Sequence, residues 1–447
     1  MVDSFQNRPR SFLIPGEKLM VLDRRAFLGK AAASLIATQI SPILLSQSET
    51  AQHLTLPPWE PGYLYIHHIS TGRGSCALLI LPDATTMMID AGSIISGLDP
   101  QADKFFIDPR PNASMRPGQW IARYTRECLS QAGRDEIDYF LLTHFHEDHF
   151  GTVWPGKYDI SPRSKFGPYQ LGGITDVAET IPVRKVIDRC YPDYAYPAPI
   201  PGPQFANYHA FIESLPSRGG TVERFVPGSE KQITLKRAPE HYPDFDIRNL
   251  ASNGDVWTGV GDQTRAHFPP LKGLKPEDYP TENKCSLAIR LRYGGFSYFS
   301  AGDEDHEEEY GRWPWGDIET AVARASGKVQ VAVADHHGFK DACGQEWVRA
   351  LKPKAFVING WDSAHPTMIS LDNMLSQELY VGSRLVFSTA TKPEAEIAIR
   401  RMASMASRNG HVIFRVPSGG NSFEVFVKDS SVPDGDVIAH FGSIPCT

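Results

Sequence analysis

Cysteine pairs are what this chain most clearly lacks. Its six cysteines are scattered, and no C-x-x-C pair occurs among them. Zinc sites built from cysteine and dithiol redox motifs need such pairs, so the sequence argues against both classes. Strong charge of either sign is also missing, since the net charge is only −7. The overall charge therefore gives no signal for nucleic-acid binding. No internal repeat is present, so a repeat architecture is not expected.

A long uninterrupted apolar run is absent too. The apolar stretch at residues 31–45 is short and contains polar residues, so it does not predict a membrane span. It follows Arg24-Arg25 and Phe27-Leu28, and this order resembles a twin-arginine export signal. The resemblance implies handling by the twin-arginine translocase and a periplasmic or extracellular location in a bacterium. A soluble amphipathic helix is the alternative.

The rest of the chain has ordinary globular composition, with 447 residues, 41% of them hydrophobic and 22% charged. We expect residues 1–50 to be the export signal and a linker. One domain is expected over residues 60–425, with loop insertions near 94–118 and 152–204. Residues 426–447 are expected to be a C-terminal tail. The 35 prolines and 37 glycines fit a protein with long loops.

The stretch Asp138–Gly151 organises the chain. An apolar run of strand character ends there in His144, His146, Asp148 and His149. Because a strand sends alternate side chains to one face, His144 and His146 point the same way. If a helix follows, Asp148 and His149 lie in its first turn and face the same cavity. These ligand types suit zinc, iron or manganese, so we predict a metal site; a run of surface histidines is the alternative.

This His-x-His-x-Asp-His motif after an apolar strand resembles the metallo-β-lactamase fold superfamily of hydrolases. The resemblance implies an α/β fold, the αββα sandwich of two mixed β-sheets flanked by helices. Residues 63–69, 76–81 and 86–92 read as strands and match the opening of that fold. The last of them ends in an Asp-x-Gly turn. Asp90 in this turn would orient a metal-binding histidine, and a plain turn aspartate is the alternative.

Two later strands also end in potential ligands. Residues 285–303 form a predicted hairpin, and the resemblance implies that Asp303 at its end bridges two metal ions. Residues 329–335 form a strand that is followed by His336 and His337. Neighbouring strand residues point to opposite faces, so only one of the two is a ligand, and we predict His336. The remaining predicted strands are 183–188, 355–359, 384–388 and 411–416, with the last two in the second sheet.

Three short motifs resemble a narrower branch of the superfamily. They are Gly302-Asp303, the His-His-Gly sequence at 336–338 and His365-Pro366. Together they resemble the metallo-hydrolase domain of the ComEC competence proteins and the secreted hydrolases related to it.

One position departs from the wider superfamily. Many members place a histidine before the strand that here begins at Ser286, whereas this chain has Asn283, as the ComEC branch does. Asn283 would bind metal weakly through its amide oxygen or hold a water, and Asp188 is an alternative substitute. We therefore expect a weaker first metal site, and a one-metal enzyme is the alternative.

These motifs give a predicted ligand set of His144, His146, Asp148, His149, Asp303 and His336. We expect one or two zinc ions there, with manganese or iron as alternatives. Two such ions would lower the pKa of a bridging water toward neutrality. Asp148 would also orient the nucleophile. His365 would donate a proton to the leaving group or bind a substrate oxyanion, and a purely structural role is the alternative.

The sequence thus predicts an exported metal-dependent hydrolase of phosphoester or phosphodiester bonds. Its substrate would be a small molecule, a component of the cell envelope or a nucleic acid. Hydrolysis of carboxylic ester, lactone or β-lactam bonds is the alternative enzyme activity. A metal-bound module that binds a ligand without turnover is an alternative from a different class.

Overall fold

The computed structural model describes residues 54–95, 97 and 100–447. The predicted export signal lies outside these residues. Within them, nine strands form a first sheet in the order β17-β16-β15-β1-β2-β3-β4-β5-β6. Its strands are β1 (Leu64–His68), β2 (Ala77–Ile80), β3 (Thr86–Ile89), β4 (Tyr139–Leu141), β5 (Lys185–Asp188), β6 (Thr221–Arg224), β15 (His411–Val416), β16 (Ser422–Lys428) and β17 (Val437–Pro445). The pairs from β17 to β3 are antiparallel and those from β3 to β6 are parallel, so the sheet is mixed.

The same described residues form a second mixed sheet of eight strands, in the order β14-β13-β12-β11-β10-β7-β8-β9. Its strands are β7 (Phe245–Ser252), β8 (Asp255–Trp257), β9 (Thr264–Ala266), β10 (Ala288–Tyr293), β11 (Phe296–Ser300), β12 (Val331–Val333), β13 (Ala355–Ile358) and β14 (Leu385–Ser388). The pairs from β11 to β14 are parallel and the others are antiparallel.

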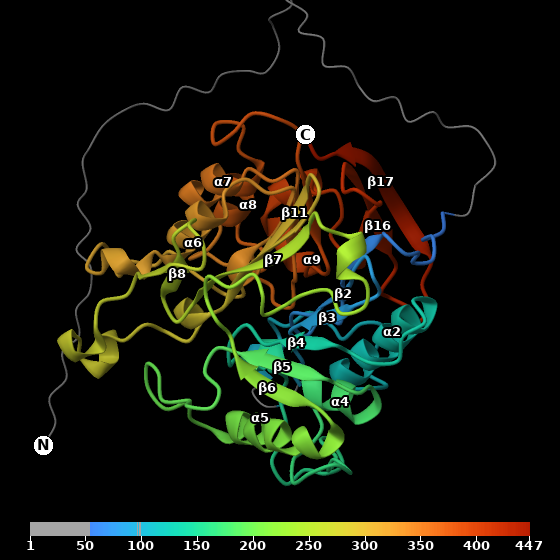
Figure 1. The fold of residues 1–447 in the computed structure, drawn as a ribbon, viewed down its shortest axis with the longest axis vertical. Coiled ribbons are helices and arrows are strands. Elements are labelled where there is room, and N and C mark those ends of the chain that lie inside the picture. The colour runs from blue at the N-terminus through green and yellow to red at the C-terminus, as the bar shows by residue number, and fades with distance from the viewer. Residues whose placement is uncertain (1–53, 96, 98–99) are drawn as a thin grey trace, which may run out of the picture. The chain divides into compact units, whose positions relative to one another are not determined.

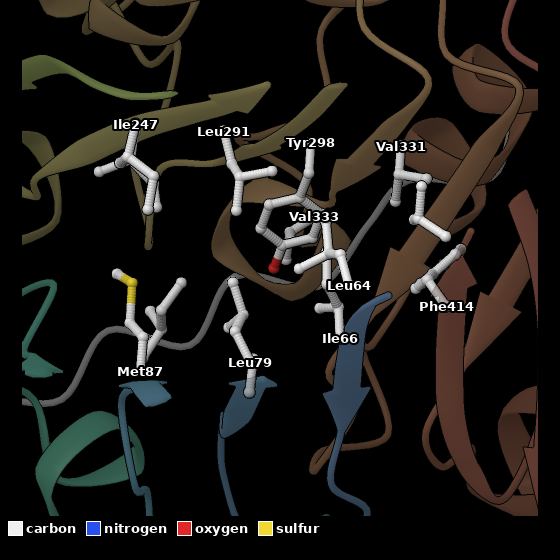
Figure 2. Packing of buried hydrophobic residues seen from close by; sticks show 14 of the residues in the cluster. Leu64, Ile66, Leu79, Met87, Ile247, Leu291, Tyr298, Val331, Val333 and Phe414 are labelled. Carbon is white, nitrogen blue, oxygen red and sulfur yellow. The ribbon is translucent and has the colours of Figure 1, made fainter. Parts of the chain in front are cut away.

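Alternation along the strands builds the core between the sheets. In β1, Leu64 and Ile66 face the second sheet, whereas Tyr65 faces the outer helices. In β11, Tyr298 likewise packs between the sheets and Phe299 packs outward. Figure 2 shows residues of the two sheets meeting across this layer. Both faces of both sheets are therefore covered, which explains why the strands read as nearly continuous apolar runs.

Helices cover the outer faces (Figure 1). The helices are α1 (Pro100–Asp103), α2 (Pro117–Gln131), α3 (Glu147–Phe150), α4 (Ile174–Thr180), α5 (Pro203–Ser214), α6 (Ile318–Ser326), α7 (Gln345–Leu351), α8 (Met368–Leu375) and α9 (Pro393–Ala398). Helices α2, α4 and α5 pack on the first sheet, and α6, α7, α8 and α9 pack on the second. The predicted αββα sandwich is confirmed. Among the helices described, none is long and apolar enough to cross a membrane.

Short 3-10 turns complete the elements. They are η1 (Pro216–Arg218), η2 (Pro239–His241), η3 (Leu271–Gly273), η4 (Pro276–Asp278), η5 (Asn283–Cys285), η6 (Pro314–Gly316), η7 (Asp335–Gly338) and η8 (Arg400–Ser404). The turns η5 and η7 carry residues of the site described below.

Two details of the predicted organisation are wrong. Residues 426–447 are no free tail, because β17 pairs with β16 and extends the first sheet. The predicted strand at 411–416 is present as β15, but it pairs with β1 in the first sheet and not in the second. Within the expected insertion at 152–204, the predicted strand at 183–188 is present as β5, and the helix α4 occupies part of the predicted loop.

Candidate metal centre

The carboxyl ends of strands from both sheets meet at one edge of the sandwich. Strands β3 and β4 run parallel in the first sheet, and β11, β12 and β13 run parallel in the second. Open α/β sheets place ligands beyond the carboxyl ends of such strands. Side chains that follow β4, β11 and β12, together with two from α3, form two groups that could hold a metal ion.

The first group follows β4 and contains His144, His146 and Asp303, whose ligand atoms lie within 4.8 Å of one another. His144 Nε2 lies 3.1 Å from His146 Nδ1 and 3.7 Å from Asp303 Oδ2. The predicted shared direction of the two histidines is found, although both lie beyond the end of β4 at Leu141 and not within the strand. His144 is fully buried, while His146 is half-buried and opens the group to solvent.

The second group contains Asp148, His149, Asp303 and His337, again with ligand atoms within 4.8 Å of one another. Asp148 and His149 lie in the first turn of α3, as predicted. His149 Nε2 lies 3.2 Å from Asp303 Oδ1, and His337 Nε2 lies 2.9 Å from Asp148 Oδ2. Asp303 belongs to both groups, so it occupies the position of a bridging carboxylate. This set of imidazole and carboxylate donors suits two divalent ions.

Electrostatics within the second group favour a cation. Burial disfavours charge, yet the imidazoles of His149 and His337 hold the pKa of Asp148 well below its usual range. The pKa of Asp303 is likewise held well below its usual range, against its burial, by His149, His337 and His144. In return, although burial acts against it, Asp303 and Asp148 raise the pKa of His337 to about 9. Two buried carboxylates thus need positive charge beside them, which protons or metal ions can supply.

The choice of His336 as the ligand is wrong. Both histidines have left-handed backbone, with φ 43° at His336 and 54° at His337, inside the turn η7. The strand β12 ends at Val333, so strand alternation does not extend to them. His337 is the one that joins the second group. His336 Nε2 lies farther from the same carboxylate, 4.0 Å from Asp303 Oδ2. Its Nδ1 donates to Asp341 at 2.7 Å.

Asp90 orients the ring of His149. Its Oδ2 accepts from His149 Nδ1 at 2.7 Å, which leaves Nε2 of that ring directed at the metal groups. The backbone and hydroxyl of Thr143 both donate to Asp90 and fix its carboxylate. Gly92 in the same turn is required because a Cβ there would lie 1.7 Å from the carbonyl oxygen of Asp148. The Asp-x-Gly turn therefore supports both a ligand and its backbone.

Asn283 lies at the start of η5, across from the His-x-His loop. The preceding Glu282 accepts a hydrogen bond from the Phe145 backbone at 2.9 Å and is paired with the buried Arg189. Asn283 Nδ2 donates to His336 Nε2 at 3.2 Å, while its Oδ1 is buried without a hydrogen-bond partner among the described residues. An amide oxygen in this state is free to bind a cation of the first group.

Asp188 is not brought to the site. Its Oδ1 accepts from the backbones of Cys190 and Tyr191. Its Oδ2 accepts from the hydroxyls of Tyr194 and Tyr208. All acceptor capacity is used to shape the loop after β5, so the alternative of Asp188 as the missing ligand is wrong.

His365 lies against the second group, stacked on His337 with ring centroids 4.7 Å apart. Its Nδ1 accepts from the backbones of Trp361 and Asp362, at 3.5 and 3.3 Å. Burial and the neighbouring imidazoles of His337 and His336 lower the pKa of His365 well below its usual range. The ring is therefore neutral with its proton on Nε2, so it can donate a hydrogen bond to an oxyanion but is a poor source of a whole proton.

Several residues of the site carry no sequence signal. Glu282 accepts from the Phe145 backbone and Asp341 accepts from the His336 ring, and both lie in segments without regular structure. Asn359 accepts through its carbonyl from His337 Nδ1 at 2.8 Å and fixes which nitrogen faces the metal groups. Trp361 Nε1 lies 3.2 Å from His337 Nε2 and can donate to it when that nitrogen carries no proton. Only the position of Asn359 and Trp361 after a predicted strand could have drawn attention to them.

Comparison with known proteins gives only distant structural matches. No family model matches the chain, and no curated protein matches its sequence. A solved protein from Parabacteroides distasonis ATCC 8503, assigned as a metal-dependent hydrolase, is 13% identical with a TM-score of 0.31; the alignment covers 72% of this chain and 92% of that chain. A metallo-β-lactamase from Cronobacter sakazakii with a mutated HARLDQ motif is 14% identical with a TM-score of 0.28, over 60% of this chain and 75% of that chain. Both scores are low, so the fold assignment rests on the sheets described above.

Proposed function

We propose that this chain is a metal-dependent hydrolase that cleaves phosphoester bonds, phosphodiesters above all. The observation that carries the proposal is Asp303, which is shared by two groups of metal-competent side chains. Paired metal sites of this kind are common in phosphatases and nucleases, where both the attacking and the leaving oxygen need stabilisation. The ComEC-like motifs around Asp303 and His365-Pro366 support placing the chain in that branch of the superfamily.

His144, His146 and Asp303 would hold one ion, and Asp148, His149, His337 and Asp303 would hold the other. Zinc suits these nitrogen and carboxylate donors, and manganese or iron would also bind them. When bound, the ions would supply an activated water near neutral pH and stabilise the negative charge that develops on phosphorus oxygens.

The protein's own side chains would prepare the reaction. Asp90 and the Asn359 carbonyl fix the rings of His149 and His337 through their Nδ1 atoms. Such partners raise the basicity of ligands and hold their orientation. Asp148 is placed both to bind metal and to orient the nucleophile. His365 offers a neutral N–H beside His337, which suits contact with a substrate oxyanion.

We also propose that the protein is exported in a bacterium. The support is the paired arginines at 24–25 and the apolar stretch at 31–45, which resemble a signal read by the twin-arginine translocase. Fusion of residues 1–52 to a reporter that is active only after export would test this. Loss of export on replacing both arginines by lysine is the expected result.

A substrate screen on metal-loaded protein tests the activity. We expect turnover of bis(4-nitrophenyl) phosphate in preference to 4-nitrophenyl phosphate, 4-nitrophenyl acetate and a chromogenic β-lactam. His146→Ala and Asp303→Ala should each lower kcat by more than tenfold while the far-ultraviolet circular dichroism stays unchanged, because the core between the sheets does not include them. Faster turnover of the acetate or β-lactam would assign the chain to ester, lactone or β-lactam hydrolysis. Metal binding with no turnover would make it a binding module.

A further inference from the structure

Arg73 is a buried cation that forms no ion pair with any of the described residues. It is 4% exposed and precedes Gly74-Ser75 in the loop after β1. Its Nε and Nη1 are buried and have no hydrogen-bond partner among the described residues. Asp103 and Asp108 act on it electrostatically, but neither forms an ion pair with it, and its close contact is the ring of Phe106, at 5.5 Å from the guanidinium carbon to the ring centroid.

The other buried arginines of the described residues have the ion pairs that Arg73 lacks. Arg189 pairs with Glu282 and also donates to the carbonyl of Tyr196. Arg248 pairs with Glu230 and Asp262. A buried charge without such partners costs several kcal/mol of effective desolvation, so chains rarely keep one unless a ligand completes it.

The backbone of Arg73 is tied to the segments that carry the metal centre. The Ser75 backbone N–H donates to the carbonyl of Asp148 at 2.8 Å, and two residues of chain span at most about 7 Å. The Arg73 carbonyl accepts from Ile94 N–H at 2.8 Å, which ties it to the turn that carries Asp90. Through its side chain, Arg73 contacts the Phe106 ring, which in turn packs on Trp361 with centroids 5.5 Å apart.

A cavity borders Arg73. It has a volume of about 350 Å³ and is lined by Arg73, Ile94, Ile95, Ser114, Arg116 and Gln119, among others. Arg116 is already paired with Asp176, so it leaves Arg73 as the unpaired cation of this wall. One carboxylate, that of Asp159, also lies on the lining. The cavity is large enough for a phosphate and the sugar or polyol that would carry it.

We propose that Arg73 binds a second phosphate of the substrate, next to the phosphodiester that is cleaved. The inference rests on the proposed function, because the second phosphate belongs to the substrate of the metal centre. It names a substrate class: a chain with at least two phosphates in succession, and not an isolated diester. Guanidinium matches the oxygens of phosphate through parallel N–H donors, and Arg73 keeps donors at Nε and Nη1 without a partner among the described residues.

The experiment compares two substrates that differ only in this phosphate. They are thymidine 5′-(4-nitrophenyl phosphate) and the same compound with a 3′-phosphate. In the wild type, we expect the 3′-phosphate to raise kcat/KM. In Arg73→Met, the ratio of the two kcat/KM values should fall by about 10- to 100-fold, the range of a charge-assisted hydrogen bond. A third compound with a 3′-carboxymethyl group reports whether a carboxylate can replace the phosphate.

A matched control and a stability measurement separate binding from structure. Arg290 also lies over an aromatic ring, Trp257, with a buried Nε that has no partner, but it is on β10 and away from the site. Arg290→Met should leave the substrate ratio unchanged. Arg73→Met should raise the Tm, because it removes an uncompensated buried charge. An equal loss on both substrates, or a lower Tm with an unchanged ratio, would make Arg73 a structural residue and overturn the proposal.

A binding arm keeps this test independent of hydrolysis. In the His146→Ala background, inorganic phosphate should still raise the Tm, and Arg73→Met should abolish that rise. If no protein hydrolyses either nucleotide but phosphate stabilises through Arg73, the proposed function fails and the anion site stands. If hydrolysis occurs, and phosphate raises the Tm of His146→Ala equally with and without Arg73→Met, the anion site fails and the proposed function stands.

Discussion

The histidine pair at 336–337 allows a sharp test of the metal centre. In His337→Ala, the second group loses the ring whose Nε2 lies 2.9 Å from Asp148 Oδ2 and 3.3 Å from His149 Nε2. Groups that only support a ligand typically cost 10- to 100-fold in metal affinity when they are removed, so a direct ligand should cost at least about 100-fold. His336 lies 4.0 Å from Asp303 and makes its close contacts to Asp341 and Asn283, so His336→Ala should cost less than about tenfold.

Competition with a chromogenic zinc chelator measures both affinities and the number of ions per chain. Circular dichroism and the Tm should show that both variants are folded. We expect the His337→Ala protein to hold one ion fewer, and the His336→Ala protein to keep the wild-type number. The reverse order of metal loss would refute the reasoning, because it would mean that the two rings exchange places when metal binds.

Three further predictions follow from the site. Asn283→His should slow the release of the more weakly held ion to a chelator, because it adds an imidazole beside the His-x-His loop; identical release curves would place residue 283 away from the metal. Asp90→Asn should weaken metal binding at the His149 side by about 10- to 100-fold without unfolding the protein, since the amide still fits the turn but supports the ring poorly; unchanged affinity would contradict this. Zinc loading at pH 7 should release protons into an indicator buffer, because His337 has a pKa of about 9 and binds metal only when deprotonated; loading without proton release would count against that pKa.

The sequence predicted the sandwich well because its strands carry local information. Each strand beside the site is an apolar run that ends in a polar residue, and the runs at β1, β2, β3, β10 and β11 are found close to where alternation and turn residues predict them. His144, His146, Asp148 and His149 come together because they sit within six residues on a strand end and one helical turn. Local geometry alone fixes such a motif.

The sequence failed where distant contacts decide the outcome. His336 and His337 depart from strand geometry because both adopt positive φ, and no pattern in the sequence predicts that turn. Glu282 reaches the His-x-His loop from 137 residues away, so neither composition nor spacing could find it. The closing strand β17 read as a tail because its residues alternate between half-buried and exposed, as expected of an edge strand with little apolar signal.

The hydrogen bond from Trp361 to His337 gives the metal centre a built-in optical reporter. An imidazole nitrogen has one lone pair, and at Nε2 of His337 an indole N–H, a proton and a metal ion all compete for it. Below the pKa of His337, about 9, a proton occupies this lone pair, and the indole can donate across 3.2 Å only above it. A metal ion replaces either of them and so changes the surroundings of the indole. The emission of one tryptophan among the eight in the chain should therefore follow metal loading in real time, without any added dye. Replacing Trp361 by Phe would remove that signal while the other seven continue to emit.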